Sequence, residues 1–281
     1  MSDAGASGSL ESAWSDVDAA PAPERLVAGL DRLRSDPFFV RGKARLYAAL
    51  ELRADQRVAD VGCGTGDDTA ALAEAGGEAI GIDRSTRLLS EARRRHASVA
   101  FVVGDARALP LATASIDRLG VDRVVQHLAR AERALGEWRR VLRPGGVIAI
   151  FEPDVTSARI EGLDPRVAER VLAWRAATRP GASVVADLPG RLEGAGFSDV
   201  SVEPAPLVLE DLARADSMMG LPDWGEAAGA AGVLDPADAA RWRPEALAAA
   251  ERGTLRFSTT YVLVSARASV RSAWPGGRSR S

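Results

Sequence analysis

Between residues 57 and 151 the chain alternates short apolar runs with longer stretches of helical periodicity, and this alternation constrains the fold more than any other feature. The apolar runs are rich in Val and Ile and too short for helices, which indicates strands. Strands that alternate with helices are typical of a parallel sheet, because each parallel pair needs a long crossover connection. We predict strands at residues 57–61, 79–82, 99–103, 116–121 and 147–151, and helices at residues 65–75, 85–96 and 131–142.

Helical segments flank this alternating region. Leu26, Leu30 and Leu33, and then Leu46 and Leu50, recur at steps of three and four on either side of a break near Asp36-Pro37, so two helices should precede the first strand. A longer, Pro-punctuated region follows residue 151. There we predict helices at residues 165–177 and 184–195, a strand at 200–202, an Ala-rich helical insert at about 205–253 and a closing strand at 255–264.

These elements predict one α/β domain with a helical cap before it and a helical insert before its last strand. The Ser/Ala/Gly/Asp-rich start and the turn-rich end, WPGGRSRS, lack any periodicity, and we expect both to be flexible. The expected segments are a flexible N-terminus (1–20), a helical cap (21–55), the domain itself (56–267) and a flexible tail (268–281).

Composition excludes several classes of function. With 36 basic and 39 acidic residues the net charge is −3, which argues against a nucleic-acid partner. Cys63 is the only cysteine, so no internal disulfide or thiolate metal cluster can form, and no His/Asp cluster indicates a metal. No uncharged run approaches the roughly 20 residues of a membrane-spanning helix. We expect a cytoplasmic protein with a small-molecule partner and no membrane partner.

One basic residue differs from the rest. Lys43 is the only lysine, and every other basic residue is an arginine. We interpret this as a compositional bias that makes arginine the default surface cation.

The segment from Asp60 to Asp68 is the most informative. A strand runs into Gly62-Cys63-Gly64-Thr65-Gly66, where glycines let the backbone turn sharply and approach a ligand. A dinucleotide fingerprint would read G-x-G-x-x-G and present a helix N-terminus to a pyrophosphate. Here Asp60, Asp67 and Asp68 would repel a diphosphate. The pattern predicts a ligand with cationic groups and disfavours a nicotinamide-dependent dehydrogenase.

Two further acids follow the next two strands. Asp83 lies about 20 residues beyond the glycine turn, where a carboxylate can accept both hydroxyl protons of a ribose. Asp105 follows the third strand. Since the carboxyl ends of parallel strands meet at one edge of the sheet, the turn and both acids should form a single ligand site.

Four motifs in order resemble the class I S-adenosylmethionine-dependent methyltransferases. They are DVGCGTG, GID, GDARALPL and RVLRPGG, and they are most similar to the ubiquinone/menaquinone biosynthesis branch and to small-molecule tailoring enzymes. The resemblance is strong from residue 57 to 154 and covers the rest in outline. It implies a Rossmann-like, seven-stranded, mostly parallel sheet with helices on both faces and an antiparallel last strand. It also implies S-adenosylmethionine as the methyl donor.

The resemblance implies a site for the methionine end of the donor. Asp60 and the turn Gly62-Cys63-Gly64 would shape it, and Asp122, after the fourth strand, would contact the donor. Arg41, in the helical cap, would pair with the donor's carboxylate. Lys43 and Tyr47, from the same part of the cap, would close over the donor together with Arg41. A solvated helix face is the alternative for Lys43.

The nucleoside end of the donor should meet a second group of residues. Asp83 would hold the ribose hydroxyls, and Asp105 with the backbone of Ala106 would meet the adenine. Arg84 would flank the adenine, or it is a solvated arginine at a helix start. The donor's sulfonium and ammonium would suit an acid-rich site.

Histidine candidates for the chemistry are His96 and His127. Methyl transfer is an in-line displacement that needs alignment more than a base. His96 ends a helix, where a cation complements the helix dipole. His127 follows the fourth strand, near the methyl-bearing end of the donor, and we assign it as the catalytic residue that acts as a base or orients the acceptor. The alternative is a wall residue that packs and bonds to backbone.

The acceptor should be a small apolar or aromatic metabolite that is O- or C-methylated. Adaptable apolar side chains suit such a pocket, although helix packing is the alternative for each of them. An enzyme of the same fold that catalyses a non-methylating cyclisation or rearrangement remains an alternative, as does a non-catalytic binding protein. The candidate pocket residues are Trp174, Met218, Met219, Leu221 and Trp224.

Overall fold

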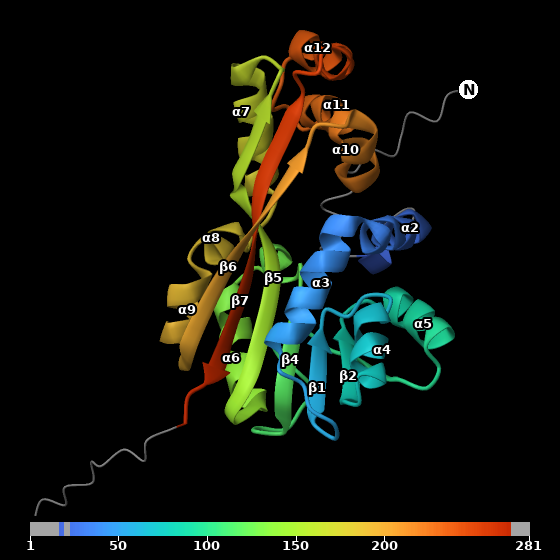
Figure 1. The fold of residues 1–281 in the computed structure, drawn as a ribbon. Helices are drawn as coiled ribbons and strands as arrows, with labels where there is room; N and C mark the ends of the chain where they lie inside the picture. The colour runs from blue at the N-terminus through green and yellow to red at the C-terminus, as the bar shows by residue number, and fades with distance from the viewer. Residues whose placement is uncertain (1–16, 20–22, 271–281) are drawn as a thin grey trace, which may run out of the picture.

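A seven-stranded sheet organises the computed structural model, which describes residues 17–19 and 23–270. Its strands are β1 (Arg57–Val61), β2 (Glu78–Asp83), β3 (Ala100–Val103), β4 (Ile116–Asp122), β5 (Leu142–Glu161), β6 (Phe197–Leu209) and β7 (Arg256–Ala268). The strand order is β3-β2-β1-β4-β5-β7-β6 (Figure 1). The pairs among β1 to β5 are parallel, whereas β7 runs antiparallel to β5 and β6. The predicted Rossmann-like α/β sheet with an antiparallel last strand is confirmed.

Helices lie before, between and after the strands. The break between the first two helices falls where it was predicted, because the Asp36 side chain accepts the N–H of Phe38 at 2.8 Å and Pro37 opens the second helix. The helices are α2 (Pro23–Ser35), α3 (Pro37–Ala49), α4 (Asp67–Glu74), α5 (Thr86–Arg95), α6 (Ala131–Val141), α7 (Pro165–Ala177), α8 (Ala182–Ala186), α9 (Leu188–Gly194), α10 (Leu212–Met219), α11 (Trp224–Ala230) and α12 (Pro236–Glu251), with short 3₁₀ turns η1 (Val17–Ala19), η2 (Val125–His127) and η3 (Leu221–Asp223).

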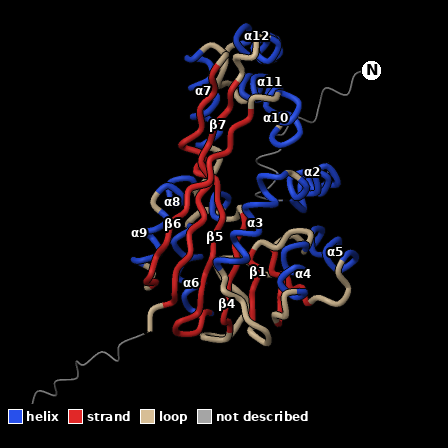
Figure 2. The backbone as a smooth tube through the Cα atoms, in the orientation of Figure 1, coloured by secondary structure: helices blue, strands red, loops and turns tan. Residues whose placement is uncertain are grey.

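Each face of the sheet has its own apolar core. Successive residues of β5 point to opposite faces, so Ile148 and Ile150 pack with residues of α6, α8 and α9. Ala149 and Phe151 pack with residues of α3 on the other face. The sheet is therefore covered by helices on both sides, as Figure 2 shows.

Two strands are much longer than predicted. The apolar signal of β5 ends at Phe151, but the strand continues to Glu161 because β7 keeps pairing with it after a register shift between Asp154 and Arg159. β6 also runs on to Leu209, so residues 205–209 belong to the sheet and not to the insert. Pairing between strands far apart in the sequence extends both of them beyond their local signal.

The long ends of β5, β6 and β7 carry an upper part of the molecule. They extend past the carboxyl edge of the parallel strands, and α7, α10, α11 and α12 pack around them (Figure 1). Trp224 and Trp242 are buried in this part, in the same apolar core as Phe39 of α3. The insert is thus joined to the cap through one continuous core.

The chain ends lie mostly outside the described residues. The structure does not describe residues 1–16 and 20 of the predicted flexible N-terminus, residues 21–22 of the predicted cap, or residues 271–281 of the predicted tail. In η1, Val17 is 6% exposed and packs with Leu26 and Leu88, so this part of the segment predicted to be flexible is ordered. Within residues 17–19 and 23–270, no helix combines the length and apolarity needed to cross a membrane.

Candidate functional site

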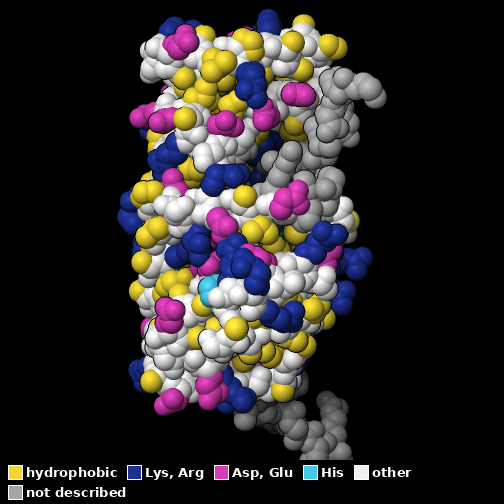
Figure 3. Space-filling view, turned by 90° about the vertical axis from the view of Figure 1, so that its right-hand side faces the viewer, with side chains coloured by type: hydrophobic (Ala, Val, Ile, Leu, Met, Phe, Trp, Pro, Cys, Tyr) yellow, Lys and Arg dark blue, Asp and Glu magenta, His cyan; other side chains and the backbone are white. Residues whose placement is uncertain are grey.

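A cavity of about 810 Å³ lies at the carboxyl edge of the parallel strands. The turns after β1, β2, β3 and β4 form its floor, and α2, α7 and α10 contribute to its walls. This volume is within the range of roughly 300–1,000 Å³ that is usual for small-molecule sites. On the side of the molecule that carries α2, α5 and α10, acidic and basic side chains are interspersed and not segregated (Figure 3).

The glycine turn after β1 needs its glycines for two reasons. Gly62 has φ +77°, and a Cβ atom there would lie 2.3 Å from Cγ2 of Val124. Gly66 has φ +81°, and a Cβ atom there would lie 2.5 Å from Cζ of Phe101. Both positions combine a left-handed backbone with close neighbours. Gly62, Cys63 and Gly64 line the cavity, as predicted.

Asp83 is tied directly to this turn. Its Oδ2 accepts the N–H of Gly64 at 3.0 Å, and its Oδ1 accepts the N–H of Ser85 at 2.8 Å. Burial raises the pKa of Asp83. The structure therefore brings Asp83 and the glycine turn together at the cavity wall, with the carboxylate held by backbone groups.

The end of β3 differs in detail from the prediction. Asp105 and Ala106 line the cavity, and so does the exposed Arg84. However, Arg107 binds both oxygens of Asp105, with Nε at 2.9 Å from Oδ1 and Nη2 at 2.6 Å from Oδ2. The side-chain hydrogen bonds from Arg107 lower the pKa of Asp105 to about 2. Arg107, which sequence reasoning missed, is thus part of this corner of the site.

Asp60 lies below the site and not in its wall. It is 4% exposed, is absent from the cavity lining, and accepts the hydroxyl of Thr69 at 2.6 Å. Burial and the nearby charge of Asp68 raise the pKa of Asp60 to about 7. Asp60 is therefore held inside the sheet by Thr69 of α4 and is not part of the cavity wall.

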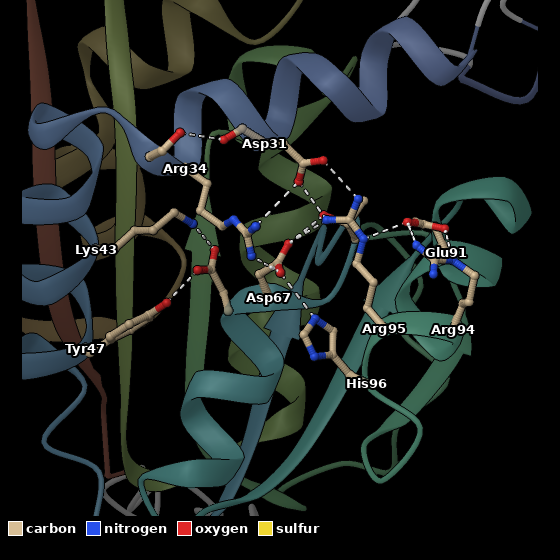
Figure 4. Close-up of polar contacts among 12 residues, drawn as sticks. Asp31, Arg34, Lys43, Tyr47, Asp67, Glu91, Arg94, Arg95 and His96 are labelled. Atoms are coloured by element: carbon tan, nitrogen blue, oxygen red, sulfur yellow. Dashed lines mark hydrogen bonds and ion pairs between the residues drawn. The ribbon is translucent and has the colours of Figure 1, made fainter.

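A row of alternating charges crosses the floor of the cavity. Lys43 of α3 lies 3.0 Å from Oδ2 of Asp122 and also pairs with Asp68, which accepts the hydroxyl of Tyr47. Asp122 in turn accepts from Nε of Arg123 at 3.1 Å and from Nη2 at 3.0 Å. Although burial opposes ionisation, the neighbouring cations hold the pKa of Asp122 at about 2. Figure 4 shows Lys43 and Tyr47 reaching from α3 toward α4.

The prediction for Arg41 is wrong. Arg41 is exposed and is absent from the cavity lining, whereas Lys43 lines the cavity. Two helical positions differ by about 200° around the axis, so the two side chains point in nearly opposite directions. The composition held one signal that could have singled out Lys43 instead: it is the only lysine among 36 basic residues.

Ion pairs also tie α2 to the core beside the glycine turn. Asp31 binds Arg95 of α5 at 2.6 and 3.0 Å, and Arg34 pairs with Asp67 at the start of α4 (Figure 4). Nε2 of His96 lies 3.2 Å from Oδ1 of Asp67. The acids predicted to attract a cationic ligand, Asp67 among them, are thus already paired with groups of the protein. His96 occupies the C-cap of α5, in agreement with its structural interpretation.

His127 lies in η2 and lines the cavity. Burial and the positive charges of Arg179 and Arg123 lower its pKa to about 3. At neutral pH the imidazole is therefore uncharged. A group with so low a pKa is a weak base, because general bases work best with a pKa near the operating pH.

Glu152 of β5 holds the turn that carries His127. Its side chain is fully buried, and Oε1 accepts the N–H groups of Val124 and, at 2.5 Å, Val125. Oε2 has no hydrogen-bond partner among the described residues. Burial raises the pKa of Glu152 to about 8. Sequence reasoning missed this residue, although an acid inside the apolar run from Ile148 to Pro153 was a visible signal.

The upper end of the cavity is mainly apolar. Met218, Met219 and Trp224 line it, as predicted for acceptor residues, and the guanidinium of Arg175 lies 3.3 Å from the ring centroid of Trp224. Phe257 and Tyr261 of β7 and Phe39 of α3 also line it and were not predicted. The structure does not bring Trp174 or Leu221 to the cavity: Leu221 is buried in the core, and the partly buried Trp174 packs against it. Their helix-packing interpretation is the correct one.

The chain is similar to known proteins. Residues 59–150 match the family model described as a methyltransferase domain. The chain is 36% identical over 223 residues to an uncharacterized 37.1 kDa protein of a transposon of Streptomyces fradiae, covering 77% of this chain and 65% of that protein. It is 38% identical over 127 residues to the demethylmenaquinone methyltransferase of Beutenbergia cavernae, covering 45% of this chain and 50% of the enzyme.

Among solved structures, the chain is similar to the cyclase SpnF. The TM-score is 0.52 with 22% identity, over 82% of this chain and 81% of that one, so the likeness concerns the fold. The chain spans between half and two thirds of the length of the two curated relatives described above.

Proposed function

Because the chain belongs to the class I S-adenosylmethionine-dependent methyltransferases, we propose that it transfers a methyl group from S-adenosylmethionine to a small apolar or aromatic metabolite. The methylated atom would be an oxygen or a carbon. The helical cap and the insert would together cover the acceptor.

One observation supports this proposal above the others. A single cavity joins Asp83 and the glycine turn at the sheet edge with the apolar wall of Met218, Met219 and Trp224. A donor bound along the edge and an acceptor against the apolar wall would then share one enclosed space. Alignment of two reactants in such a space accounts for most of what a methyl transfer requires.

The donor would supply a methyl group already activated by its sulfonium. Asp83 would accept the ribose hydroxyls, and the corner formed by Asp105, Ala106 and Arg107 would face the adenine. The glycine turn, which is hydrogen-bonded to Asp83 through Gly64, would hold the donor against the sheet. These residues bind and orient the donor, and none of them needs to move a proton.

His127 would touch the acceptor as a neutral imidazole. Its lowered pKa favours a role in orienting the acceptor through a hydrogen bond over the removal of a proton. An acceptor that reacts as a phenolate, as an enolate or through another nucleophilic carbon would not depend on a strong base from the protein.

Calorimetry with S-adenosylhomocysteine and with NAD tests the donor class. We expect S-adenosylhomocysteine to bind and NAD to bind weakly or not at all, since the site presents Asp83 and a G-x-G-x-G turn. Tighter binding of NAD would contradict the proposal.

The alternative is a non-methylating cyclisation or rearrangement, or binding without catalysis. The similar fold of the cyclase SpnF makes the first compatible with this architecture. Incubation with S-adenosylmethionine bearing a CD₃ group and a panel of phenols and β-keto compounds separates the two reactions by mass. Transfer adds the labelled methyl group to a product, whereas cyclisation leaves the mass of the substrate unchanged.

A further inference from the structure

Two polar side chains of the cavity wall make no hydrogen bond to any other group within residues 17–19 and 23–270. They are the phenol of Tyr261 in β7 and the imidazole of His127 in η2, and both residues line the cavity. Tyr261 is only 8% exposed. Buried polar groups without a partner destabilise a fold, so a ligand that pairs with these two groups would explain their presence.

The ring of Tyr261 is fixed by other aromatic rings. Its centroid lies 5.0 Å from that of Phe38, 5.6 Å from that of Phe39 and 5.1 Å from that of Phe151. These distances are typical of stable aromatic pairs. Burial raises the pKa of Tyr261 to about 12, so its hydroxyl keeps the proton at neutral pH. Tyr261 therefore offers the cavity a neutral hydrogen-bond donor in a fixed position.

Arg179, which follows α7, is bound to the turn that carries His127. Its Nε donates to Oε1 of Gln126 at 2.8 Å, and its Nη1 donates to the carbonyl oxygen of Arg175 at 2.9 Å. Gln126 is 5% exposed and precedes His127 in η2. The N–H of Gly181 also donates to the carbonyl oxygen of Gln126, at 3.0 Å. These contacts hold a guanidinium at the cavity wall beside His127.

The electrostatic surroundings of His127 favour a negative ligand. Burial lowers the pKa of His127, and the positive charges of Arg179 and Arg123 lower it further. No carboxylate in the part of the chain that the structure describes opposes this effect. The imidazole is neutral at neutral pH and has one N–H to donate. A ligand anion would meet both a donor and a positive potential here.

Arg123 and Arg179 also act on Tyr261, where two acids oppose them. One of these acids, Asp122, is bound through both oxygens by Arg123 and lies 3.0 Å from Nζ of Lys43. The other is Glu152, and burial raises its pKa to about 8, so at neutral pH most of it carries a proton. Neither acid therefore excludes an anion from the space beside Tyr261.

We propose, on the premise of the proposed methyl transfer, that Tyr261, His127 and Arg179 form an anion subsite for the acceptor. The subsite would hold the ionised oxygen of an acidic phenol or β-dicarbonyl compound, by two neutral donors and one cation. The acceptor loses its proton to solvent before it binds, so the protein needs no strong base.

Transfer to the bound oxygen then balances its charges. A lone pair of the oxygen forms the new C–O bond, and the electrons of the broken C–S bond stay on sulfur. The negative oxygen becomes a neutral ether oxygen, and the sulfonium becomes a neutral thioether. The product has lost the charge by which the acceptor was held, which favours its release.

The probe 4-nitrophenol tests the subsite while the natural acceptor is unidentified. Its phenolate absorbs visible light and its neutral form does not, so the absorbance at neutral pH reports which form is bound. With the protein saturated by S-adenosylhomocysteine, we expect the phenolate to bind about 10- to 100-fold more tightly than the phenol, as charge-assisted hydrogen bonds predict. The visible absorbance of the probe should therefore rise on binding.

Two variants remove parts of the subsite. Tyr261→Phe deletes one oxygen atom and keeps the aromatic packing, so this variant should fold, and its affinity for the phenolate should be about tenfold lower. Arg179→Met should lower that affinity about 10- to 100-fold. In both variants the affinity for 4-nitroanisole, which has no ionisable oxygen, should stay within about twofold of the wild type in calorimetry.

Arg166→Met is the matched control, because it removes a cation from an exposed position of α7. It should leave the affinities for both probes within about twofold of the wild type. Thermal melts establish that each variant is folded. If Arg179→Met is unfolded, Tyr261→Phe alone decides the question.

The outcomes are distinct. A rise in absorbance that Tyr261→Phe loses and Arg166→Met keeps supports the subsite. The proposal is overturned if the complex with S-adenosylhomocysteine does not bind 4-nitrophenol, or binds it without a rise in absorbance. Equal losses for 4-nitrophenol and 4-nitroanisole overturn it too, since they make the residues structural. If the wild type does not bind S-adenosylhomocysteine, the proposed function itself fails, and calorimetry shows this before any probe is added.

Discussion

The lower and upper ends of the cavity are built in different ways. At the sheet edge, polar groups from consecutive strand ends are held by backbone N–H groups and ion pairs, as for Asp83 and Asp122. At the upper end, apolar side chains from α3, α10, α11 and β7 meet although they are far apart in the sequence. Each polar group at the sheet edge is fixed in one position by its hydrogen bonds, and few other residues could make the same contacts. The apolar wall, in contrast, is formed by many weak contacts.

This difference indicates which substitutions the protein tolerates. A change at the sheet edge removes a specific contact or closes the turn, so donor affinity should respond strongly. A change in the apolar wall removes part of a large adaptable surface, so donor affinity should hardly respond. The following substitutions test the contrast.

Gly62→Ala should have the largest effect. The new Cβ would overlap Val124 at a backbone φ of +77°, so strain and overpacking together should lower the free energy of unfolding by about 2–5 kcal/mol. S-adenosylhomocysteine binding should be abolished. Gly64→Ala is the control, because its Cβ would meet only Cδ1 of Leu30 at 3.5 Å and should cost about 1–2 kcal/mol. Chemical denaturation and calorimetry measure both, and equal effects would contradict the argument.

Asp83→Ala should weaken S-adenosylhomocysteine binding about 100-fold, as expected for the loss of charge-assisted hydrogen bonds. Methylthioadenosine, which has the ribose but not the amino-acid end, should lose affinity equally. Asp105→Ala should cost less than about tenfold, since Arg107 already occupies both oxygens of that carboxylate. Unchanged calorimetric affinity in Asp83→Ala would mean that the ribose acid is misassigned.

Glu152→Gln should change how stability depends on pH. The pKa of Glu152 is raised from 4.5 to about 8, so the wild type should lose stability as the pH rises through this interval. The glutamine variant cannot ionise and should not share this loss. Between pH 5 and pH 8.5 we expect the melting temperature of the wild type to fall by roughly 3 °C or more relative to the variant. Parallel pH profiles from thermal melts would contradict a raised pKa of Glu152 in the folded protein.

Met219→Ala should have the smallest effect on the donor. Met219 lines the apolar wall, and its backbone carbonyl, which accepts from Nε1 of Trp224, is preserved in the variant. The affinity for S-adenosylhomocysteine should stay within about twofold of the wild type. A loss of tenfold or more in calorimetry would mean that the two ends of the cavity are not independent.

The sequence predicted the sheet edge better than the upper part. The strand bounds 57–61 and the helix 165–177 match the structure, because period, glycine and proline signals lie within each segment. The long ends of β5 and β6 were missed, since their polar residues are held in strands by pairing with β7. Trp174 and Met218 could not be told apart in advance, because both are apolar residues on amphipathic helices and only packing separates wall from core.

The amino-acid sequence by itself determined the glycine turn and the acids that follow the strands, because backbone conformation and the direction of a parallel strand are local properties. The tertiary structure alone decided which cation of α3 faces the cavity, how Asp105 is occupied and how far the pKa values of His127 and Glu152 move. Those outcomes depend on burial and on charges contributed by segments distant in the chain, and such distances are defined only when the chain has folded.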